Sequence, residues 1–399
     1  LCVKPSDGSG DFDFSRNSAA TRVNAQGLVE NVQILSSNLV QNPSFSEEGV
    51  QEVSNGSFSQ EGSELITNGD FSSDTDWTKG TGWSIGGGTA NCDGTQTSNS
   101  SLRSQTFVVG SNPTLKLTFD VVNYSSGLLA AGITGTGQAD ITNINANGTY
   151  SVIVVSSTGN RLVDFVADAD FIGSIENCSV REVGQDWNLG SGWSIAEDKA
   201  VATNSASGQK LRQAGQLTAS KTYKLVYEVT ELTLGGFLPI VGAVQGTAVY
   251  SIGTYTEYIT TTNDDFYIRT LGTTSGSITN ISVKEVGMDW VLFSGWSIGN
   301  DKVVGDGTAF TDVSQTPILI QNKKVKLTFD VLDYVSGTFR IPPSDRQDGL
   351  DERFSGNGSY EVIYTSTVPY FRFQQQALAG SITNISVIEI TTDTNLPRI

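Results

Sequence analysis

The chain has 399 residues, of which 37% are hydrophobic and 17% charged, with 43 glycines and a formal net charge of −18. This length fits two to four domains, since a single core rarely grows beyond ~250–300 residues. The acidic balance argues against a nucleic-acid partner, because a phosphate backbone needs a basic face. The absence of histidine excludes Ser-His-Asp and Cys-His catalysis and His-ligated metals. No apolar run approaches ~18 residues, so we expect no membrane insertion.

Residues 1–64 differ from the rest of the chain in composition. They contain too few apolar residues to form a core of their own. A short motif recurs at a 13-residue spacing, as Asn42-Pro43-Ser44-Phe45, Asn55-Gly56-Ser57-Phe58 and Asn68-Gly69-Asp70-Phe71. Only the third copy precedes a full module, so the first two are either vestigial module starts or turns along a stem. We expect an extended segment that a partner or self-association orders.

All six tryptophans share one spacing, Asp-Trp-x5-Trp-Ser-Ile. The pairs are Trp77 and Trp83, Trp187 and Trp193, and Trp290 and Trp296. A period near 100 residues corresponds to one whole domain rather than to a solenoid unit. We therefore predict three tandem modules, at 65–184, 185–287 and 288–391, followed by a C-terminal tail at 392–399.

Each predicted module has an alternating strand near its middle, for example Leu115, Leu117, Phe119 and Val121 in the first. Period-two alternation marks a strand with one buried and one wet face. Each module ends in Gly-Ser-Ile-x-Asn, and a break in the alternation at Thr279-Asn280 predicts a β-bulge. Roughly eight strand signals per module, with no helical period, predict an all-β fold of β-sandwich or jelly-roll modules.

The paired tryptophans have two interpretations. Two rings six residues apart on an extended chain point the same way, which suits a platform for stacking sugars. Alternatively, the rings fill the core near the entry of each module and pack against a neighbour. Their identical placement beside every linker favours the structural interpretation.

Two of the three cysteines align with apolar residues of the other modules. Cys178 matches Ile281 and Ile385, and Cys92 matches Ala202 and Gly305. Both therefore are predicted to be small buried residues. A Cys92–Cys178 bridge stays open as an alternative, should the first and last strands of the module be neighbours.

The Asn68-Gly69-Asp70-Phe71 turn with Trp77 and Trp83 resembles the opening of the jelly-roll carbohydrate-binding modules attached to xylanases and glucanases. The resemblance covers about residues 65–390 as three units and implies a galactose-binding-like β-sandwich. It also implies a structural calcium ion, for which Asp70 is the matching position, and no other cofactor.

The sugar-binding aromatics of that family match no position here. By strand parity, the candidate platform residues are Tyr124 and Tyr334, with ordinary turn packing as the alternative. Tyr370, Phe371 and Phe373 form a denser aromatic cluster, which is more typical of a core.

The order Phe12-Asp13-Phe14-Ser15-Arg16, Ala20-Thr21-Arg22-Val23-Asn24 and Gly27-Leu28-Val29-Glu30 resembles a segment near the N-terminus of tailed-bacteriophage virion proteins, typically fibre or appendage proteins. The resemblance covers about 30 residues. It implies a protein of the virion surface, outside the cell. Residues 1–64 would attach to other virion proteins, the C-terminal modules would face outward, and the protein would be a homo-oligomer, for which we expect a trimer.

The sequence favours binding over catalysis. Acidic pairs such as Asp264-Asp265 and Asp168/Asp170 do not recur between modules, so we expect no enzyme activity. The main hypothesis is a virion fibre whose modules adhere to a host surface polysaccharide, with avidity from tandem sites. The alternatives are a spacer or capsid decoration without its own ligand, and an accessory binding region of a secreted bacterial glycoside hydrolase or adhesin.

One apolar stretch leaves a structural question open. Residues 232–244 read Leu-Thr-Leu-Gly-Gly-Phe-Leu-Pro-Ile-Val-Gly-Ala-Val. An exposed patch of that size would contact a neighbouring protein. The alternative is a pair of buried strands joined by Gly235-Gly236.

Overall fold

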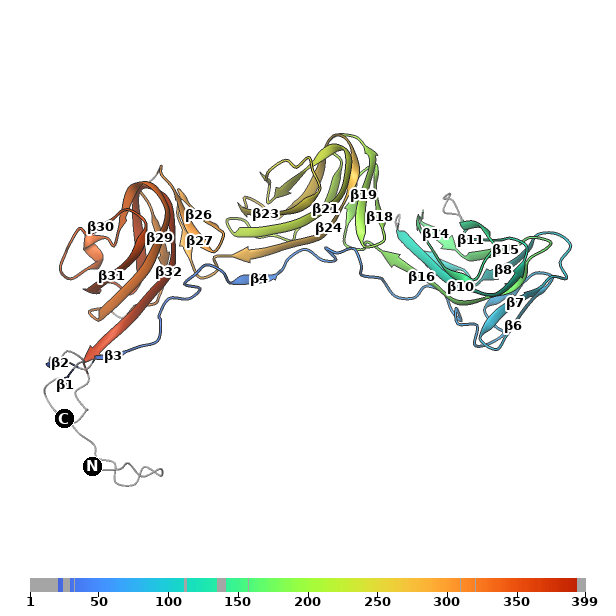
Figure 1. Ribbon diagram of the computed structural model, residues 1–399, viewed down its shortest axis with the longest axis horizontal. Coiled ribbons are helices and arrows are strands. Elements are labelled where there is room, and N and C mark those ends of the chain that lie inside the picture. Colours follow the sequence, from blue (N-terminus) through green and yellow to red (C-terminus); the bar gives the residue numbers. More distant parts are fainter. Residues whose placement is uncertain are drawn as a thin grey trace, which may run out of the picture. The chain divides into compact units, whose positions relative to one another are not determined.

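The computed structural model describes residues 21–23, 29–31, 33–110, 113–134, 141–156, 158–308, 310–319 and 321–392. Every described element is a β-strand apart from the short 3-10 turn η1 (Pro343–Asp345). The strands fall into three successive sets that match the three repeats (Figure 1). The predicted all-β class is confirmed. None of the described segments is a helix long and apolar enough to cross a membrane.

Module 1 is a sandwich of two five-stranded antiparallel sheets. One sheet has the strand order β13-β10-β16-β7-β6 and the other β12-β11-β15-β8-β5, with β9 and β14 as a separate pair. The alternating residues Leu115, Leu117, Phe119 and Val121 all lie on β10 and are at most 1% exposed, so this strand lines the core. The strand bounds are β5 (Trp77–Lys79), β6 (Trp83–Gly86), β7 (Thr89–Asp93), β8 (Ser100–Ser104), β9 (Phe107–Val109), β10 (Thr114–Ser126), β11 (Leu129–Ile133), β12 (Ile141–Ile144), β13 (Gly148–Val155), β14 (Gly159–Arg161), β15 (Val163–Ala167) and β16 (Ile172–Val183).

Modules 2 and 3 keep this plan with longer strands. The positions of β10 and β11 are taken by one bent strand, and those of β15 and β16 by another, so these strands run through both sheets. Module 2 consists of β17 (Asn188–Leu189), β18 (Trp193–Ala196), β19 (Lys199–Ser205), β20 (Lys210–Gln213), β21 (Thr222–Val241), β22 (Val244–Gln245), β23 (Gly253–Thr260) and β24 (Phe266–Val286). Module 3 consists of β25 (Val291–Leu292), β26 (Trp296–Gly299), β27 (Lys302–Asp306), β28 (Asp312–Gln315), β29 (Lys324–Arg340), β30 (Arg353–Phe354), β31 (Gly358–Thr365) and β32 (Phe371–Thr392).

The apolar stretch 232–244 belongs to the core of module 2. It is the second half of β21, and the strand bends at Gly235, whose φ of 71° lies in the left-handed region. Residues 236–241 are buried. The buried alternative therefore holds, although one continuous strand with a hairpin to β22 replaces the expected pair of strands.

The predicted bulge is present in all three modules. Asn177, Asn280 and Asn384 have φ of 53°, 52° and 54°. On either side of Asn177 and Asn384, the pairing of β16 with β10 and of β32 with β29 shifts register. Such a bulge turns the next N–H out of the ladder. This outward N–H belongs to Cys178 in module 1, to Ile281 in module 2 and to Ile385 in module 3.

Those three N–H groups donate to the N-terminal segment. We call residues 36–71 the strap, because its three Asn-x-x-Phe turns pair with the three modules. The turns contact the modules in reverse order, so that 42–45 lies on module 3, 55–58 on module 2 and 68–71 on module 1. The bulge hydrogen bonds run from Ile385 to the Pro43 carbonyl (3.0 Å), from Ile281 to Gly56 (2.9 Å) and from Cys178 to Gly69 (2.8 Å).

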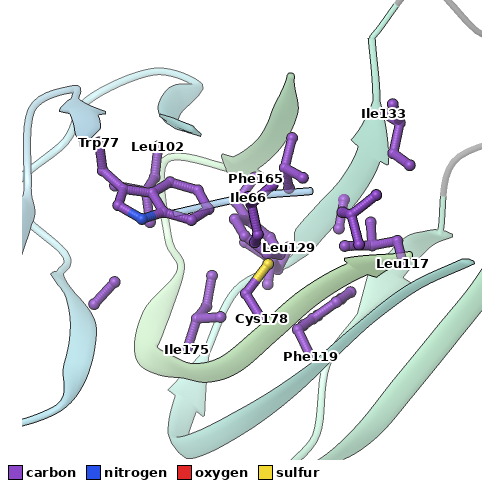
Figure 2. Close-up of a cluster of buried hydrophobic side chains, with 14 of the residues drawn as sticks. Ile66, Trp77, Leu102, Leu117, Phe119, Leu129, Ile133, Phe165, Ile175 and Cys178 are labelled. Atoms are coloured by element: carbon purple, nitrogen blue, oxygen red, sulfur yellow. The ribbon is translucent and has the colours of Figure 1, made fainter. Parts of the chain in front are cut away.

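The strap corrects two expectations. The first two turns are not vestigial, since each completes the core of a module encoded far downstream. In its described part the segment is ordered by the chain's own modules, where we had expected a partner or self-association. Phe45, Phe58 and Phe71 are at most 2% exposed, and Ile66 lies beside Cys178, Leu129 and Phe165 inside module 1 (Figure 2).

One of the described strands before the strap lies against the end of module 3. β1 (Thr21–Val23) pairs with β2 (Val29–Asn31), and β3 (Gln33–Leu35) pairs with the last residues of β32. Further along, β4 (Glu48–Gln51) pairs with β24 (Figure 1). The chain thus enters the strap at module 3, and the expected attachment of residues 1–64 to other virion proteins stays a prediction. The remaining residues of the virion-like segment lie outside the described part.

Candidate carbohydrate-binding face

The outer face of module 3 carries a row of polar side chains that spans three strands. On β32, Phe371 and Phe373 point into the core and are at most 1% exposed, while Arg372 and Gln374 at the alternate positions face outward. The register places Gln374 opposite Asp312 of β28 on one side and Arg340 of β29 on the other. Period-two alternation thus assembles one polar row across three strands.

The side chains of this row form a continuous network, which we call the polar band. The Arg340 guanidinium donates to Asp351 (2.6 Å) and twice to the amide oxygen of Gln374 (2.9 and 3.1 Å). The Gln374 amide donates to Asp312 (3.1 Å). Because planar groups are held at both ends, their free hydrogen-bonding positions are fixed in direction before any ligand arrives.

The band continues beyond these strands at both ends. Arg372 links Asp312 (2.7 Å) to Asp345 of η1 (2.7 and 3.0 Å). At the opposite end, Arg353 of β30 donates to Asp351 (2.7 Å). The two ends differ in exposure, since the Asp345 side chain is 5% exposed and that of Arg353 is 44% exposed. The Asp345 end is therefore anchored, and the Arg353 end is open to solvent.

Two aromatic rings flank the band. Phe310 is 59% exposed, and its ring centre lies 5.6 Å from the Arg340 guanidinium carbon. The ring of Tyr370 lies 5.5 Å from the guanidinium carbon of Arg372. Single exposed apolar residues are common on protein surfaces, so the informative feature is the position of this ring beside fixed polar groups. Ring faces next to directed donors and acceptors are what a sugar's apolar face and hydroxyls require.

The charges of the band balance internally. Three arginines face three aspartates, and hydrogen bonds from Arg340 and then Arg353 lower the pKa of Asp351. The hydrogen bond to Asp345 is the main cause of the raised pKa of Arg372. Because the arginines and aspartates are equal in number, the formal charges of the band cancel. Such a surface suits a polar, hydroxyl-rich ligand better than a strongly charged one.

The same rows of modules 1 and 2 have different residues. The Asp312–Gln374 pair corresponds by register to Lys210–Arg269 in module 2 and to Ser101–Val166 in module 1. Lys210 instead lies over the Tyr267 ring at 4.1 Å. In the described parts of both modules, the band has no counterpart. Module 3 is thus specialised on a face that the shared fold does not require.

The two predicted platform residues lie elsewhere, and the structure does not bring them together. Tyr124 and Tyr334 are half-buried at the bends of β10 and β29, in different modules. Each hydroxyl donates to a carbonyl of its own turn, that of Gly127 (3.1 Å) and that of Gly337 (3.0 Å). Their contacts are those of turn packing, and a role in sugar binding stays a prediction.

All six tryptophans are buried, with 6–8% of each residue exposed. The first of each pair contacts the strap. Trp77, Trp187 and Trp290 donate their indole N–H to the carbonyls of Asn68, Asn55 and Asn42, at 3.0, 3.0 and 3.1 Å. The neighbour against which they pack is therefore the strap turn. Buried rings cannot serve as an open sugar platform.

Cys92 and Cys178 are free buried thiols, so the alternative of a bridge between them is wrong. The registers match the alignment made from sequence, since Cys92, Ala202 and Gly305 each lie opposite the second tryptophan of their module. Burial raises the pKa of both thiols. These cysteines are core residues.

The calcium position has no supporting cluster in the described residues. No group of three or more Asp, Glu, Cys or His side chains suited to a metal ion occurs among them. Asp70 is exposed and accepts a hydrogen bond from the Ser72 amide at 3.3 Å. A calcium ion at Asp70 stays a prediction of the resemblance alone.

Sequence reasoning did not find the polar band. One signal was available, because residues 340–353 hold three arginines and four acidic residues in a chain with only 17% charged residues. A second was the alternation Phe371-Arg372-Phe373-Gln374, in which only the aromatic half was noticed. The acidic pairs considered for catalysis have local roles, such as that of Asp265, which pairs with Arg212 at 2.8 Å.

Comparisons with known proteins give only remote similarities. No family model matches the chain, and no curated protein matches it. Among solved structures, the tandem carbohydrate-binding modules CBM22-1 and CBM22-2 of Xyn10C from Paenibacillus barcinonensis align over 57% of this chain and 98% of theirs, with 8% identity and a TM-score of 0.21. A GH2 β-galacturonidase from Eisenbergiella tayi bound to galacturonate aligns over 54% of this chain and 39% of its own, with 12% identity and a TM-score of 0.18. Likenesses at such TM-scores carry no functional argument.

Proposed function

We propose that the chain is a non-enzymatic adhesion protein that binds a polysaccharide through the outer face of module 3. The observation that carries this proposal is the polar band with the exposed ring of Phe310 beside it. A pre-ordered row of planar donors and acceptors binds sugar hydroxyls without paying much ordering entropy. The ring supplies the apolar contact that hydroxyl groups cannot make.

We further propose that the protein is an appendage of a bacteriophage virion and that the polysaccharide belongs to the surface of a bacterial host. The support is the order of residues in 12–30, which resembles the N-terminal segment of such virion proteins. Attachment through the N-terminal residues, a trimeric state and an extracellular location are parts of the same proposal.

The test is retention of the full chain in gels containing candidate capsular, O-antigen and exopolysaccharides. On the polysaccharide that retains the chain, Arg340→Ala and Phe310→Ala should weaken binding about 10-fold or more, because each removes a charge-assisted bond or a ring contact. The matched control is Arg212→Ala, an outward arginine paired with an aspartate on the equivalent face of module 2. Equal retention of all three variants would place the site elsewhere, and no retention on any surface polysaccharide would contradict adhesion.

A structural spacer is the second candidate, and the strap favours it. Three turns of one segment fill the cores of three modules, an arrangement that suits load-bearing more than ligand capture. Retention of the virion role after loss of all polysaccharide binding, in the Arg340→Ala variant, would support the spacer.

A further inference from the structure

The three strap turns are bound by the same set of groups in each module. We call this set the slot. It consists of the first tryptophan, the N–H that follows the bulge, and the N–H of a valine two residues further along. Phe45 lies 4.9 Å from Trp290, Phe58 5.1 Å from Trp187 and Phe71 5.0 Å from Trp77, measured between ring centres.

The strap side of each contact repeats every 13 residues. A side-chain oxygen of the strap accepts a hydrogen bond from the valine N–H. The Val387 N–H donates to Asn38 (2.9 Å), that of Val283 to Gln51 (2.9 Å) and that of Val180 to Glu64 (2.8 Å). Two residues later comes a buried branched residue, Val40, Val53 or Ile66. The turn itself follows after one more residue. The ligand of a slot is therefore a continuous eight-residue peptide, which runs over 38–45, 51–58 or 64–71.

Modules 2 and 3 add a clamp for which module 1 has no counterpart among its described residues. The buried side chain of Gln315 accepts the Gln41 N–H (3.0 Å) and donates to the Gln41 carbonyl (2.6 Å). Gln213 does the same for Ser54, at 3.0 and 2.6 Å. The register gives Ser104 at this position of module 1. The extra clamp occurs where the strap turn comes from a distant part of the sequence.

Module 1 shows the slot with a turn that is continuous with the module, since Phe71 precedes Trp77 by six residues. In module 3 the turn and its tryptophan are 248 residues apart. Since every slot contact depends on the peptide and none on the covalent connection, the module is a complete receptor for the peptide. Backbone bonds give the affinity and the Phe pocket gives the selectivity, as in other modes of strand addition.

We propose that the slots of modules 2 and 3 are peptide-binding sites that accept the Asn-x-x-Phe segment as a separate molecule. The ligand class is an extended peptide with a hydrogen-bond acceptor, a branched apolar residue, Asn and Phe at relative positions 1, 3, 5 and 8. The proposal is independent of polysaccharide binding, because the slot lies under the strap and the polar band lies on the outer face of one sheet.

The test uses the full chain with a protease recognition sequence inserted between Glu47 and Glu48, both exposed. After cleavage, the fragment ending at Glu47 should stay bound to module 3 on size-exclusion chromatography. A fluorescent peptide of residues 33–47 should then replace it, which fluorescence anisotropy follows. A peptide of residues 46–60, which carries the second turn, should compete for the same slot.

The decisive comparison is between two peptide variants. Phe45→Ala should bind on the order of 100-fold more weakly, because Phe45 is 1% exposed and its removal empties the pocket. Leu35→Ala is the matched control, since Leu35 is 53% exposed, and its affinity should change less than about 3-fold. Equal binding of the two variants would overturn the proposal. So would release of the fragment on cleavage without later capture of the peptide.

Discussion

The backbone conformation of the strap turn explains why the turn begins with asparagine, and its first carbonyl satisfies the first tryptophan of each module. A tryptophan buried this deeply needs a partner for its N–H. The Asn42, Asn55 and Asn68 carbonyls supply it, and these residues have φ of 42°, 47° and 54°. Asparagine enters that left-handed region more easily than most residues. Asparagine therefore suits the turn, and the turn presents the carbonyl that the tryptophan needs.

Cys178 gives a prediction at the same scale, since burial, together with the nearby Glu64, raises the pKa of its thiol well above the ordinary value. The native state then favours the neutral thiol. This stabilisation is complete below the unfolded-state pKa of ~8.5 and is lost as the pH rises toward the folded-state pKa. Above pH ~8.5, the free energy of unfolding of the wild type should fall faster than that of Cys178→Ala, by up to about 1.4 kcal/mol per pH unit. Urea titrations from pH 7 to 10 with a reductant measure this, and parallel curves would contradict it.

At the scale of elements, the bulge joins three functions at one position. It shifts the register of the ladder, it exposes an N–H to the strap, and its asparagine amide donates to an acidic residue on the neighbouring strand. In module 3, Asn384 donates to Asp330 at 2.7 Å. Hydrogen bonds from Ser359 and then Asn384 lower the pKa of Asp330. The bulge is thus held by its side chain as well as by its backbone.

Asn384→Ala should destabilise module 3 by about 2 kcal/mol, because alanine disfavours the left-handed conformation and the amide bond is lost. Asn384→Gly, which keeps the conformation, should cost roughly half as much. The bond to ionised Asp330 stabilises the fold above the unfolded-state pKa of ~3.9 and is lost as the pH falls through the folded-state pKa. The cost of Asn384→Gly should therefore be smaller at pH 3 than at pH 7. Thermal unfolding at both pH values tests this, and equal costs for the two variants would contradict the conformational argument.

The sequence was sufficient for features that recur inside each module. The tryptophan spacing, the alternation of Leu115 to Val121 and the bulge at Asn280 were predicted because each follows a local period that three copies repeat. The role of the strap was not predicted. The strap turns repeat every 13 residues and the modules about every 100 residues, so an alignment of the repeats does not place each turn beside its module. Its best signal was that the turns and the modules are equal in number.

The polar band escaped prediction for a different reason. Comparing repeats draws attention to what modules share, whereas Arg340, Gln374 and Asp312 are particular to module 3. Their contact also depends on the pairing of β28, β29 and β32, which join residues up to 62 positions apart. Charge density alone would have pointed to the region, without showing which side chains meet.

At the scale of the whole molecule, the strap makes the folding of module 3 strongly non-local. The turn at 42–45 is synthesised first, and its partners Trp290 and Ile385 come last. Contacts of such sequence separation form slowly. During synthesis, the first two turns stay unpaired until their modules are complete. Phe45 is exposed during this time, which favours aggregation.

The strap turns are divided between two compact units, so each turn should affect the stability of its own unit. Residues 1–50 and 284–399 form one unit, and residues 51–283 form the other. Phe45 and its contact Trp290 belong to the first, while Phe58 and its contact Trp187 belong to the second. A cavity at one strap turn should therefore weaken one unit and leave the other unchanged, since distant sites without shared partners act additively.

Phe45→Ala should lower the unfolding temperature of the first unit by roughly 6–20 °C, and Phe58→Ala that of the second by a similar amount. These values follow from a cost of about 3–5 kcal/mol for deleting a buried phenylalanine and from about 2–4 °C per kcal/mol in units of this size. Calorimetry resolves the transitions, and hydrogen exchange read by mass spectrometry assigns each one to its residues. Phe293→Ala is the control, because Phe293 is 52% exposed and its loss should shift neither transition by more than about 1 °C. If both strap variants shifted both transitions equally, the strap would couple the units into one cooperative structure, since the folding of each unit would then depend on every turn.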